Sequence, residues 1–118
     1  MKIFENLFHP FDLIYVSYFS TVAPKIISPL NDVKIRSGQT LHIEVDYVGE
    51  PEPVVVWKRD GTTLKSDTKR ITITAIGHHT IIHTVNAVRG DSGEYVLNIK
   101  NESGSDTGSL MVCVLGKF

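Results

Sequence analysis

Along most of the chain, hydrophobic residues alternate with polar ones at every second position, in short runs separated by turn residues. The clearest run is Leu41–Tyr47, whose odd-numbered residues are all apolar and whose even-numbered residues are His, Glu and Asp. Alternation with period two is typical of a β-strand that buries one face. The same pattern predicts further strands, in chain order at residues 25–28, 33–36, 54–59, 70–76, 80–85, 95–100 and 110–114.

Turn residues stand between the runs at intervals of about eight to twelve positions, the spacing expected of an all-β domain. The strongest signal is Asp60-Gly61, which favours a tight turn. We expect Asn101–Gly108, rich in Ser, Gly and Asp, to form a longer loop. No helical period of useful length and no internal repeat occurs. The pattern along residues 23–115 therefore predicts one all-β domain, a sandwich of two antiparallel sheets.

The alternation also assigns residues to the core. Within residues 80–85 the period alone leaves two choices. Either Ile82 and Thr84 point inward, or Ile81, His83 and Val85 do. Cys113 falls between two inward residues, so we expect its thiol to face outward and to be inert, with no neighbour in sequence that lowers its pKa. Further inward positions are Val55, Trp57, Leu110, Val112 and Val114.

A chain of 118 residues is long enough for one domain but not for two. Hydrophobic residues make up 42% and charged residues 21%, the net charge is −1, and no run of five like charges occurs. We therefore expect no binding to nucleic acid or to an acidic membrane driven by bulk charge. The single cysteine, Cys113, can form no internal disulfide and excludes Cys-rich zinc motifs.

The first 22 residues differ in character, since they are crowded with Phe, Tyr, Ile and Leu. Their longest clean apolar run, Leu13–Val22, is too short for a transmembrane helix, which needs about 18 or more apolar residues. A cleaved signal peptide is one alternative, with Lys2 ahead of the apolar run, but Asp12 abuts that run. The other alternative, which we favour, is a poorly ordered leader before the domain. Residues 116–118 are then a tail or the start of a linker.

Four aromatic and aliphatic residues share a specific spacing. Val45 precedes Trp57 by 12 positions, and Leu97 follows Trp57 by 40. Tyr95 lies two positions before Leu97, at the end of the segment Asp91–Tyr95, which reads D-S-G-E-Y. This arrangement resembles the immunoglobulin pattern of Cys, Trp and Cys, with a tyrosine corner two residues before the second Cys.

Three further stretches narrow the resemblance. Residues 23–27, 49–53 and 101–104 look like the intermediate set of immunoglobulin-like domains, and most like the modules of giant intracellular muscle proteins of the twitchin and titin type. The resemblance covers about residues 24–115 and implies a β-sandwich with Greek-key connections. Its register also favours Ile82 as an inward residue.

In this resemblance, Val45 and Leu97 occupy the positions where extracellular domains carry a disulfide. A bridge that closes a loop of this length contributes about 4 kcal/mol in the chain-entropy model. Two branched side chains packed on Trp57 offset part of that loss, at about 1.5–3 kcal/mol each when fully buried. A domain without the bridge is expected in the cytosol. The resemblance implies a structural core of Val45, Trp57, Leu97 and Tyr95, a corner with Asp91 and Gly93, and an ion pair between Arg70 and Asp91.

Two short motifs suggest adhesion instead. Arg89-Gly90-Asp91 is the tripeptide that integrins bind, and Asn101-Glu102-Ser103 is a glycosylation sequon, which matters only in a secreted protein. An adhesion ligand needs both of its charges on an exposed loop. The resemblance instead places Asp91 in the edge of the sandwich, so we expect a structural role for this carboxylate.

Four histidines lie in or beside the predicted strands. His79 and His83 share a strand face but are four residues apart, about 13 Å along a strand. One zinc ion cannot join them, because its ligand bonds are near 2 Å. His42 and His83 become neighbours on the outer face if their two strands pair. No carboxylate or cysteine completes a ligand set in the sequence, so we expect solvated histidines, no metal and no cofactor.

No nucleophile with its base, phosphate-binding glycine loop or catalytic pair of acids occurs, so we expect no enzyme. The resemblance implies a cytoplasmic module of the muscle sarcomere that serves as tandem-domain spacer, load-bearing link and docking surface. Its partners would be neighbouring immunoglobulin or fibronectin type III domains and muscle filament proteins, with the isolated domain a monomer. The load-bearing pair would be residues 33–36 against residues 110–114. The alternative is a secreted or cell-surface adhesion domain, and a third possibility is regulation of an attached kinase.

Overall fold

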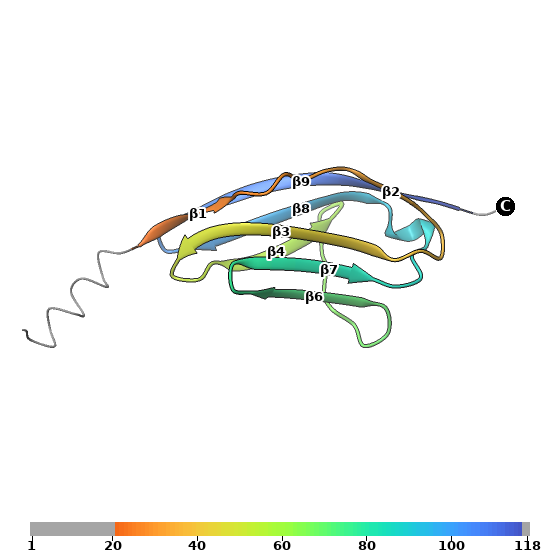
Figure 1. Cartoon of the computed structure of the whole chain (residues 1–118), viewed down its shortest axis with the longest axis horizontal. Helices are drawn as coiled ribbons and strands as arrows, with labels where there is room; N and C mark the ends of the chain where they lie inside the picture. Colours follow the sequence, from red (N-terminus) through yellow and green to blue (C-terminus); the bar gives the residue numbers. More distant parts are fainter. Residues whose placement is uncertain (1–20, 117–118) are drawn as a thin grey trace, which may run out of the picture.

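Two β-sheets packed face to face make up the part of the chain that is described, residues 21–116 of a computed structural model (Figure 1). The expected all-β sandwich is confirmed. Most of the expected leader lies outside these residues, and no helix within them is long and apolar enough to cross a membrane. The elements are β1 (Val22–Ile26), β2 (Val33–Arg36), β3 (Leu41–Glu50), β4 (Val54–Arg59), β5 (Thr62–Thr63), β6 (Ile71–Ile76), β7 (His79–Thr84), the 3-10 helix η1 (Arg89–Asp91), β8 (Gly93–Asn101) and β9 (Gly104–Leu115).

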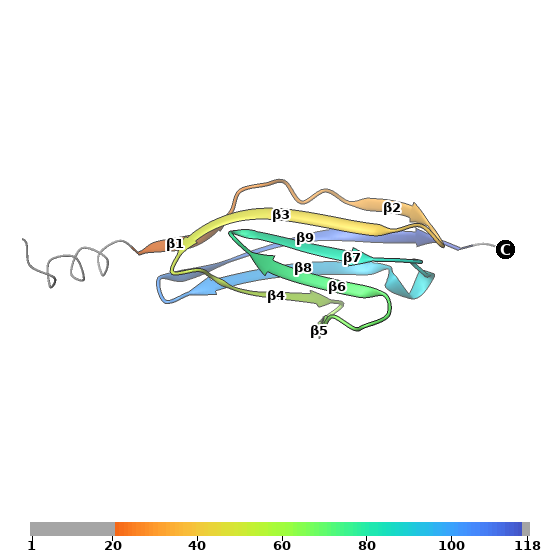
Figure 2. The same ribbon diagram turned by 60° about the horizontal axis from the view of Figure 1, so that its bottom comes forward.

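The chain changes sheets repeatedly, as Greek-key connections require. One sheet has the order β1-β3-β7-β6 and the other the order β2-β9-β8-β4-β5 (Figure 2). Neighbouring strands run antiparallel with one exception: β2 lies parallel to β9, with Val33 opposite Val112 and Arg36 opposite Leu115. A parallel pair needs a long crossover, and here nearly the whole domain lies between the two strands.

The period-two pattern places the core between the sheets. In β3 the burial alternates without a break over ten residues. Ile82 and Thr84 of β7 are buried, so the choice left open by the sequence is resolved in their favour, and Thr80 is buried with them. The buried hydrophobic residues are Leu41, Ile43, Val45, Tyr47, Trp57, Ile82, Ala87, Tyr95, Leu97, Ile99, Leu110, Val112 and Val114.

A hydrogen bond across the core fixes Trp57. Its indole Nε1 donates to the Thr80 hydroxyl at 3.0 Å, and that hydroxyl donates to the Thr74 carbonyl oxygen at 2.8 Å. Trp57 belongs to one sheet and Thr80 to the other. A buried indole N–H needs an acceptor, since leaving it unpaired costs free energy. Thr80 therefore orients the central aromatic ring as well as filling space.

Replacing Thr80 with valine is expected to lower the free energy of unfolding by about 1–3 kcal/mol, because Val keeps the volume but leaves the Trp57 N–H without an acceptor. Urea unfolding followed by Trp57 fluorescence measures the change. The control is Thr74→Val, which alters an exposed side chain and keeps the Thr74 carbonyl group in place. Equal stability of the two variants would show that the Trp57–Thr80 bond contributes nothing.

The prediction of a long loop at residues 101–108 is wrong. The polar stretch instead continues β8 and begins β9, with only Glu102 and Ser103 at the turn. Pairing with β8 satisfies the backbone groups of this stretch, which outweighs the turn preference of its Gly and Ser residues. Asp106 caps β1 by accepting the Ile26 N–H at 2.8 Å, and Gly108 leaves room for the Leu30 side chain, which would have to shift to admit a β-carbon at position 108.

Other strand boundaries also move. β1 runs from Val22 to Ile26 rather than over residues 25–28, so it begins at the last residue assigned to the leader. β3 continues to Glu50, beyond the expected end at Tyr47. The two-residue strand β5 was not expected at all, because two exposed threonines after a tight turn carry no periodic signal.

Candidate interaction surfaces

The tyrosine corner forms where β8 begins. The Tyr95 hydroxyl donates to the Asp91 carbonyl oxygen at 2.6 Å. Gly93 has a φ of +144°, and a β-carbon there would collide with the Asp60 carboxylate. That carboxylate accepts the Glu94 N–H at 3.0 Å, so the β4–β5 turn is tied to the start of β8. These contacts hold the corner rigid.

The carboxylate of Asp91 is buried at the same corner and is surrounded by donors. Arg70 binds it with two hydrogen bonds, Nη1 to Oδ2 at 3.0 Å and Nη2 to Oδ1 at 3.2 Å. The Val88 N–H donates to Oδ2 at 2.8 Å, and Arg59 Nη1 lies 3.7 Å from Oδ1. Burial by itself raises the pKa of Asp91, but the Arg70 and Val88 hydrogen bonds outweigh it and hold the pKa below its usual value.

The burial of Asp91 bears directly on the adhesion motif. Asp91 is 3% exposed and both of its carboxylate oxygens are occupied within the domain, so it cannot reach a receptor. The Asn101 side chain of the sequon is also engaged, since its Nδ2 donates to the Val22 and Pro51 carbonyl oxygens at 2.9 and 3.0 Å. A glycan attached to this nitrogen replaces one of its two hydrogen atoms, so it would break at least one of those bonds. Neither motif is presented for adhesion in this fold.

Of the remaining residues singled out by the sequence, two lie in the core and one lies on the surface. Val45 in β3 and Leu97 in β8 are buried on the inner faces of opposite sheets, and Leu97 lies opposite Trp57 in the β4–β8 ladder. Cys113 is exposed on β9, the other face from its neighbours Val112 and Val114. Val45 and Leu97 therefore build the core, while the Cys113 side chain takes no part in it.

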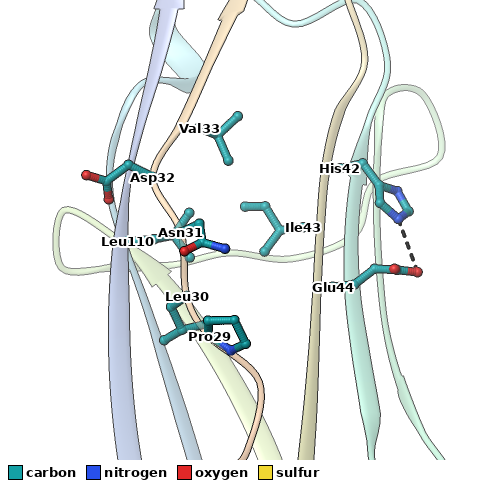
Figure 3. Close-up of a pocket in the computed structure, with 9 residues that line it drawn as sticks. All are labelled: Pro29, Leu30, Asn31, Asp32, Val33, His42, Ile43, Glu44 and Leu110. Atoms are coloured by element: carbon teal, nitrogen blue, oxygen red, sulfur yellow. Dashed lines mark ion pairs between the residues drawn. The ribbon is translucent and has the colours of Figure 1, made fainter.

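A small groove lies between β3 and the segment that leads into β2 (Figure 3). Its volume is about 190 Å³. Leu30 and Ile43 form part of its apolar wall, while Asp32 binds the Met111 N–H at 2.8 Å. His42 and Glu44 stand at its open side, 3.2 Å apart between Nε2 and Oε2. The groove is too small for a drug-sized ligand. Two of its lining residues, His42 and Glu44, also belong to a row of charged groups on the outer face of the sheet.

That row follows the outer face of β3 and β7, and we call it the histidine–carboxylate row: His83, His42, Glu44, His79 and Asp46. His42 lies directly opposite His83 in the ladder, with the two Nδ1 atoms 3.2 Å apart. His79 contacts Asp46 through Nδ1 and lies 3.6 Å from Glu44 through Nε2. The hydrogen bond from Asp46 raises the pKa of His79, so this imidazole is more readily charged than usual.

A second polar cluster lies at the end of the sandwich where β1 begins. His78 Nε2 lies 2.9 Å from the Gly49 carbonyl oxygen and 3.0 Å from Glu50 Oε2. The Gly49 contact, with the charges of Glu50 and Glu52, raises the pKa of His78. The Tyr47 hydroxyl donates to Glu52 at 3.1 Å, and burial together with this bond raises the pKa of Tyr47 to about 12. The cluster ties the β3–β4 turn to the β6–β7 turn.

The outer face of the five-stranded sheet is more apolar than the face that carries the histidine–carboxylate row. Val54, which is 68% exposed, and Val56 line a shallow hollow of about 480 Å³ beside Lys100. A second hollow of about 380 Å³ shares Val56 and continues to Val96. These valines form a small apolar patch on this face.

Several of these contacts could not be found from the sequence. Glu44 and Asp46 carry only the polar half of a strand alternation, which says nothing of the residues across the ladder. Arg59 sits at the end of β4, next to the turn, and nothing in its neighbourhood points to Asp91. The Arg70–Asp91 pair was named only because the resemblance implied it. Pairing between strands, rather than spacing along the chain, creates all of these contacts.

Several known proteins with similar sequences are muscle proteins. The muscle M-line assembly protein unc-89 of Caenorhabditis elegans is 32% identical over 94 residues, which cover 80% of this chain and 1% of that protein. Human fast-type myosin-binding protein C is 36% identical over 97 residues, covering 80% of this chain and 8% of the relative. The chain thus spans only a small part of each of these proteins.

Solved structures and a family model agree with these relatives. A titin M10 complex with obscurin-like 1 superposes with a TM-score of 0.78 at 27% identity, covering 84% of this chain and 99% of the other. Titin z1z2 in complex with telethonin also gives 0.78, at 28% identity, covering 84% of this chain and 50% of that one. The model of the immunoglobulin I-set domain matches residues 24–114. The resemblance drawn from the sequence is therefore confirmed, and the chain belongs to the immunoglobulin I-set family, among relatives from muscle.

Proposed function

We propose that this domain is a non-enzymatic structural and protein-interaction module of a twitchin- or titin-like sarcomeric protein. In that protein it serves as a spacer between tandem domains, as a link that bears load and as a docking surface. The relatives of similar sequence are large muscle proteins, of which one domain of this size is a small part. We further propose a cytoplasmic location in the sarcomere and a monomeric isolated domain.

The observation that carries the load-bearing role is the parallel pair of β2 and β9. In Figure 1, β1 begins at one end of the sandwich and β9 ends at the other. Tension applied through the two ends pulls β2 and β9 in opposite directions along their length. Four residues of each strand are paired, from Val33 with Val112 to Arg36 with Leu115, so their hydrogen bonds are loaded together rather than one at a time. Shear of this kind resists force better than unzipping does.

The proposed partners follow from the net charge of this domain and from the complexes that similar proteins form. The similar structures include titin domains in complex with obscurin-like 1 and with telethonin. For this chain we propose neighbouring immunoglobulin or fibronectin type III domains, together with muscle filament proteins. Because the net charge is −1, shape and apolar contact contribute more to such docking than bulk charge.

Two observations count against the secreted adhesion domain. It requires an exposed Asp91 and a free Asn101 side chain, and both are held inside the domain. It also requires stability outside the cell without a disulfide, since the two usual positions hold Val45 and Leu97.

Expression of the whole chain as a fluorescent fusion in muscle cells tests the proposal. We expect a striated sarcomeric pattern and no mass shift from glycosylation at Asn101. The matched variant Asn101→Gln removes the sequon, and it should leave both the location and the apparent mass unchanged. Secretion of the fusion, with a glycan that disappears in Asn101→Gln, would contradict the proposal and support the adhesion domain.

A further inference from the structure

The pair of histidines at one end of the histidine–carboxylate row lies on an exposed sheet face, away from the buried corner and the parallel pair. We infer that His42 and His83 form a binding site for a single divalent transition-metal ion, of the kind that prefers imidazole nitrogen, such as Cu²⁺ or Zn²⁺. The ion would bridge β3 and β7 at the point where the two residues face each other across the ladder. This site is independent of the sarcomeric function proposed above.

The distance between the two ring nitrogens supports this inference. Nδ1 of His42 and Nδ1 of His83 are 3.2 Å apart. Two nitrogens bound to one zinc ion at about 2.0–2.1 Å with a tetrahedral angle are about 3.3–3.4 Å apart, and at a right angle about 2.9 Å. The observed separation falls between these values. The ring centroids are 5.5 Å apart, so the two Nδ1 atoms face each other almost head-on. Each ring must therefore turn by roughly 35° before both lone pairs converge on one ion at these bond lengths. Both side chains are at least partly exposed, which leaves room for this turn.

The hydrogen bond made by the other nitrogen of His42 supports the same assignment. Glu44 Oε2 lies 3.2 Å from His42 Nε2, so the carboxylate holds the proton on Nε2 and leaves the Nδ1 lone pair directed at His83. A metal-binding histidine typically donates its second ring N–H to a carboxylate in this way. Without metal, the Nδ1 atoms share one proton in a hydrogen bond. Metal binding needs both Nδ1 lone pairs, so the His83 proton moves from Nδ1 to Nε2 through solvent and both imidazoles stay neutral.

The number of protein ligands is limited to two. Among residues 21–116, no three His, Cys, Asp or Glu side chains gather closely enough to hold one metal ion. The His42 side chain is 47% exposed, so water can fill the remaining coordination positions. The sequence alone had excluded His79 and His83 as joint ligands because of their spacing. The sequence placed His42 beside His83 only on the condition that their strands pair, and the pairing of β3 with β7 meets that condition.

Titration of the whole chain with CuCl₂ or ZnCl₂ by calorimetry tests the site. We use a Cys113→Ser background, because an exposed thiol binds soft metals independently. One ion should bind per chain, with Cu²⁺ tighter than Zn²⁺. At a hundredfold excess over Kd, the bridge should raise Tm by roughly 10 °C, because the ion binds only the folded arrangement.

Substitutions identify the ligands. His42→Ala and His83→Ala should each abolish saturable binding, and Glu44→Gln should weaken it roughly 10- to 100-fold by releasing the orientation of His42. His79→Ala, on the same face, and His9→Ala, outside the described residues, are matched controls that should retain wild-type affinity. Circular dichroism without metal shows that each variant is folded.

Two outcomes would overturn the inference. The first is the absence of saturable binding of either ion to the Cys113→Ser chain. The second is one-to-one binding that persists in both His42→Ala and His83→Ala, or that disappears in His79→Ala or His9→Ala. A ¹⁵N spectrum of the imidazoles gives a second readout, in which Zn²⁺ should shift the His42 and His83 resonances and leave those of His78 in place.

Discussion

Replacing Asp91 with alanine should lower the free energy of unfolding by about 3–5 kcal/mol, the range expected when one partner of a buried ion pair is removed. The Arg70 guanidinium would lose both of its hydrogen bonds to the carboxylate, and the Val88 N–H would lose its acceptor. The start of β8 would loosen with them, because Tyr95 bonds to the backbone of the same residue. Chemical unfolding followed by Trp57 fluorescence measures the loss.

Glu94→Ala serves as the control, since it removes an exposed carboxylate three residues further on and should change stability by no more than about 0.5 kcal/mol. A double variant, Arg70→Met with Asp91→Leu, distinguishes the loss of the ion pair from the cost of leaving one of its charges without a partner. It should recover part of the loss, because the Arg70 guanidinium, the main charge paired with Asp91, is removed together with the carboxylate. An Asp91→Ala protein as stable as Glu94→Ala would show that the corner does not depend on this carboxylate.

Acid should act on the same pair. The pKa of Asp91 is lower in the folded chain than its ordinary value of 3.8, so the folded state binds this proton less readily than the unfolded state does. Its contribution to stability is therefore complete above that ordinary value and is lost as the pH falls through the folded pKa. The stability difference between wild type and Asp91→Ala should be constant near neutral pH and shrink in strong acid. A difference that stayed constant down to pH 2 would contradict this account.

The sandwich could be predicted because the strands that build it bury one face each. β3 alternates without interruption, and the bounds of β2 and β4 were predicted correctly. The pattern failed where both faces of a strand are polar. Residues 104–108 carry Gly, Ser, Asp and Thr, so no hydrophobic period announces the strand, and its existence depends on backbone pairing with β8.

The candidate sites were predictable to a smaller extent, for a related reason. Arg70 and Asp91 are 21 residues apart, and only the resemblance brought them together in advance. His42 and His83 are 41 residues apart, and their contact needs both the pairing of β3 with β7 and its register. A shift of one residue in that register would turn one of the two side chains to the other face. Spacing along the chain carries neither piece of information.

The backbone of β9 faces two partners, which decides how the load-bearing pair can be tested. The Met111 N–H donates to Asp32 and the Leu115 carbonyl oxygen accepts from Ser37, so both groups face the β2 side. The Val114 N–H donates to Ser92, on the β8 side. Because these directions alternate along a strand, the Cys113 N–H faces β2 and the Val112 N–H faces β8. The side chain of Cys113 is exposed, so position 113 can be changed without altering the core.

Cys113→Pro should lower the free energy of unfolding by about 2–3 kcal/mol, because proline removes a donor to β2 and its ring disturbs a strand that is paired on both sides. Its larger effect should be mechanical. In single-molecule pulling of the domain between two reference domains, the unfolding force should fall well below that of the wild type, since the lost bond belongs to the pair under shear.

Two further variants separate this effect from a general loss of stability. Cys113→Ser keeps the N–H and should unfold at the wild-type force. Thr74→Pro removes a donor on β6, which pairs only with β7 and lies outside the β2–β9 pair, so it should lower Tm while leaving the unfolding force nearly unchanged. If Thr74→Pro reduced the force as much as Cys113→Pro, resistance to tension would follow overall stability, and the parallel pair would have no special share in it. A drop confined to Cys113→Pro would assign the load to the bonds between β2 and β9.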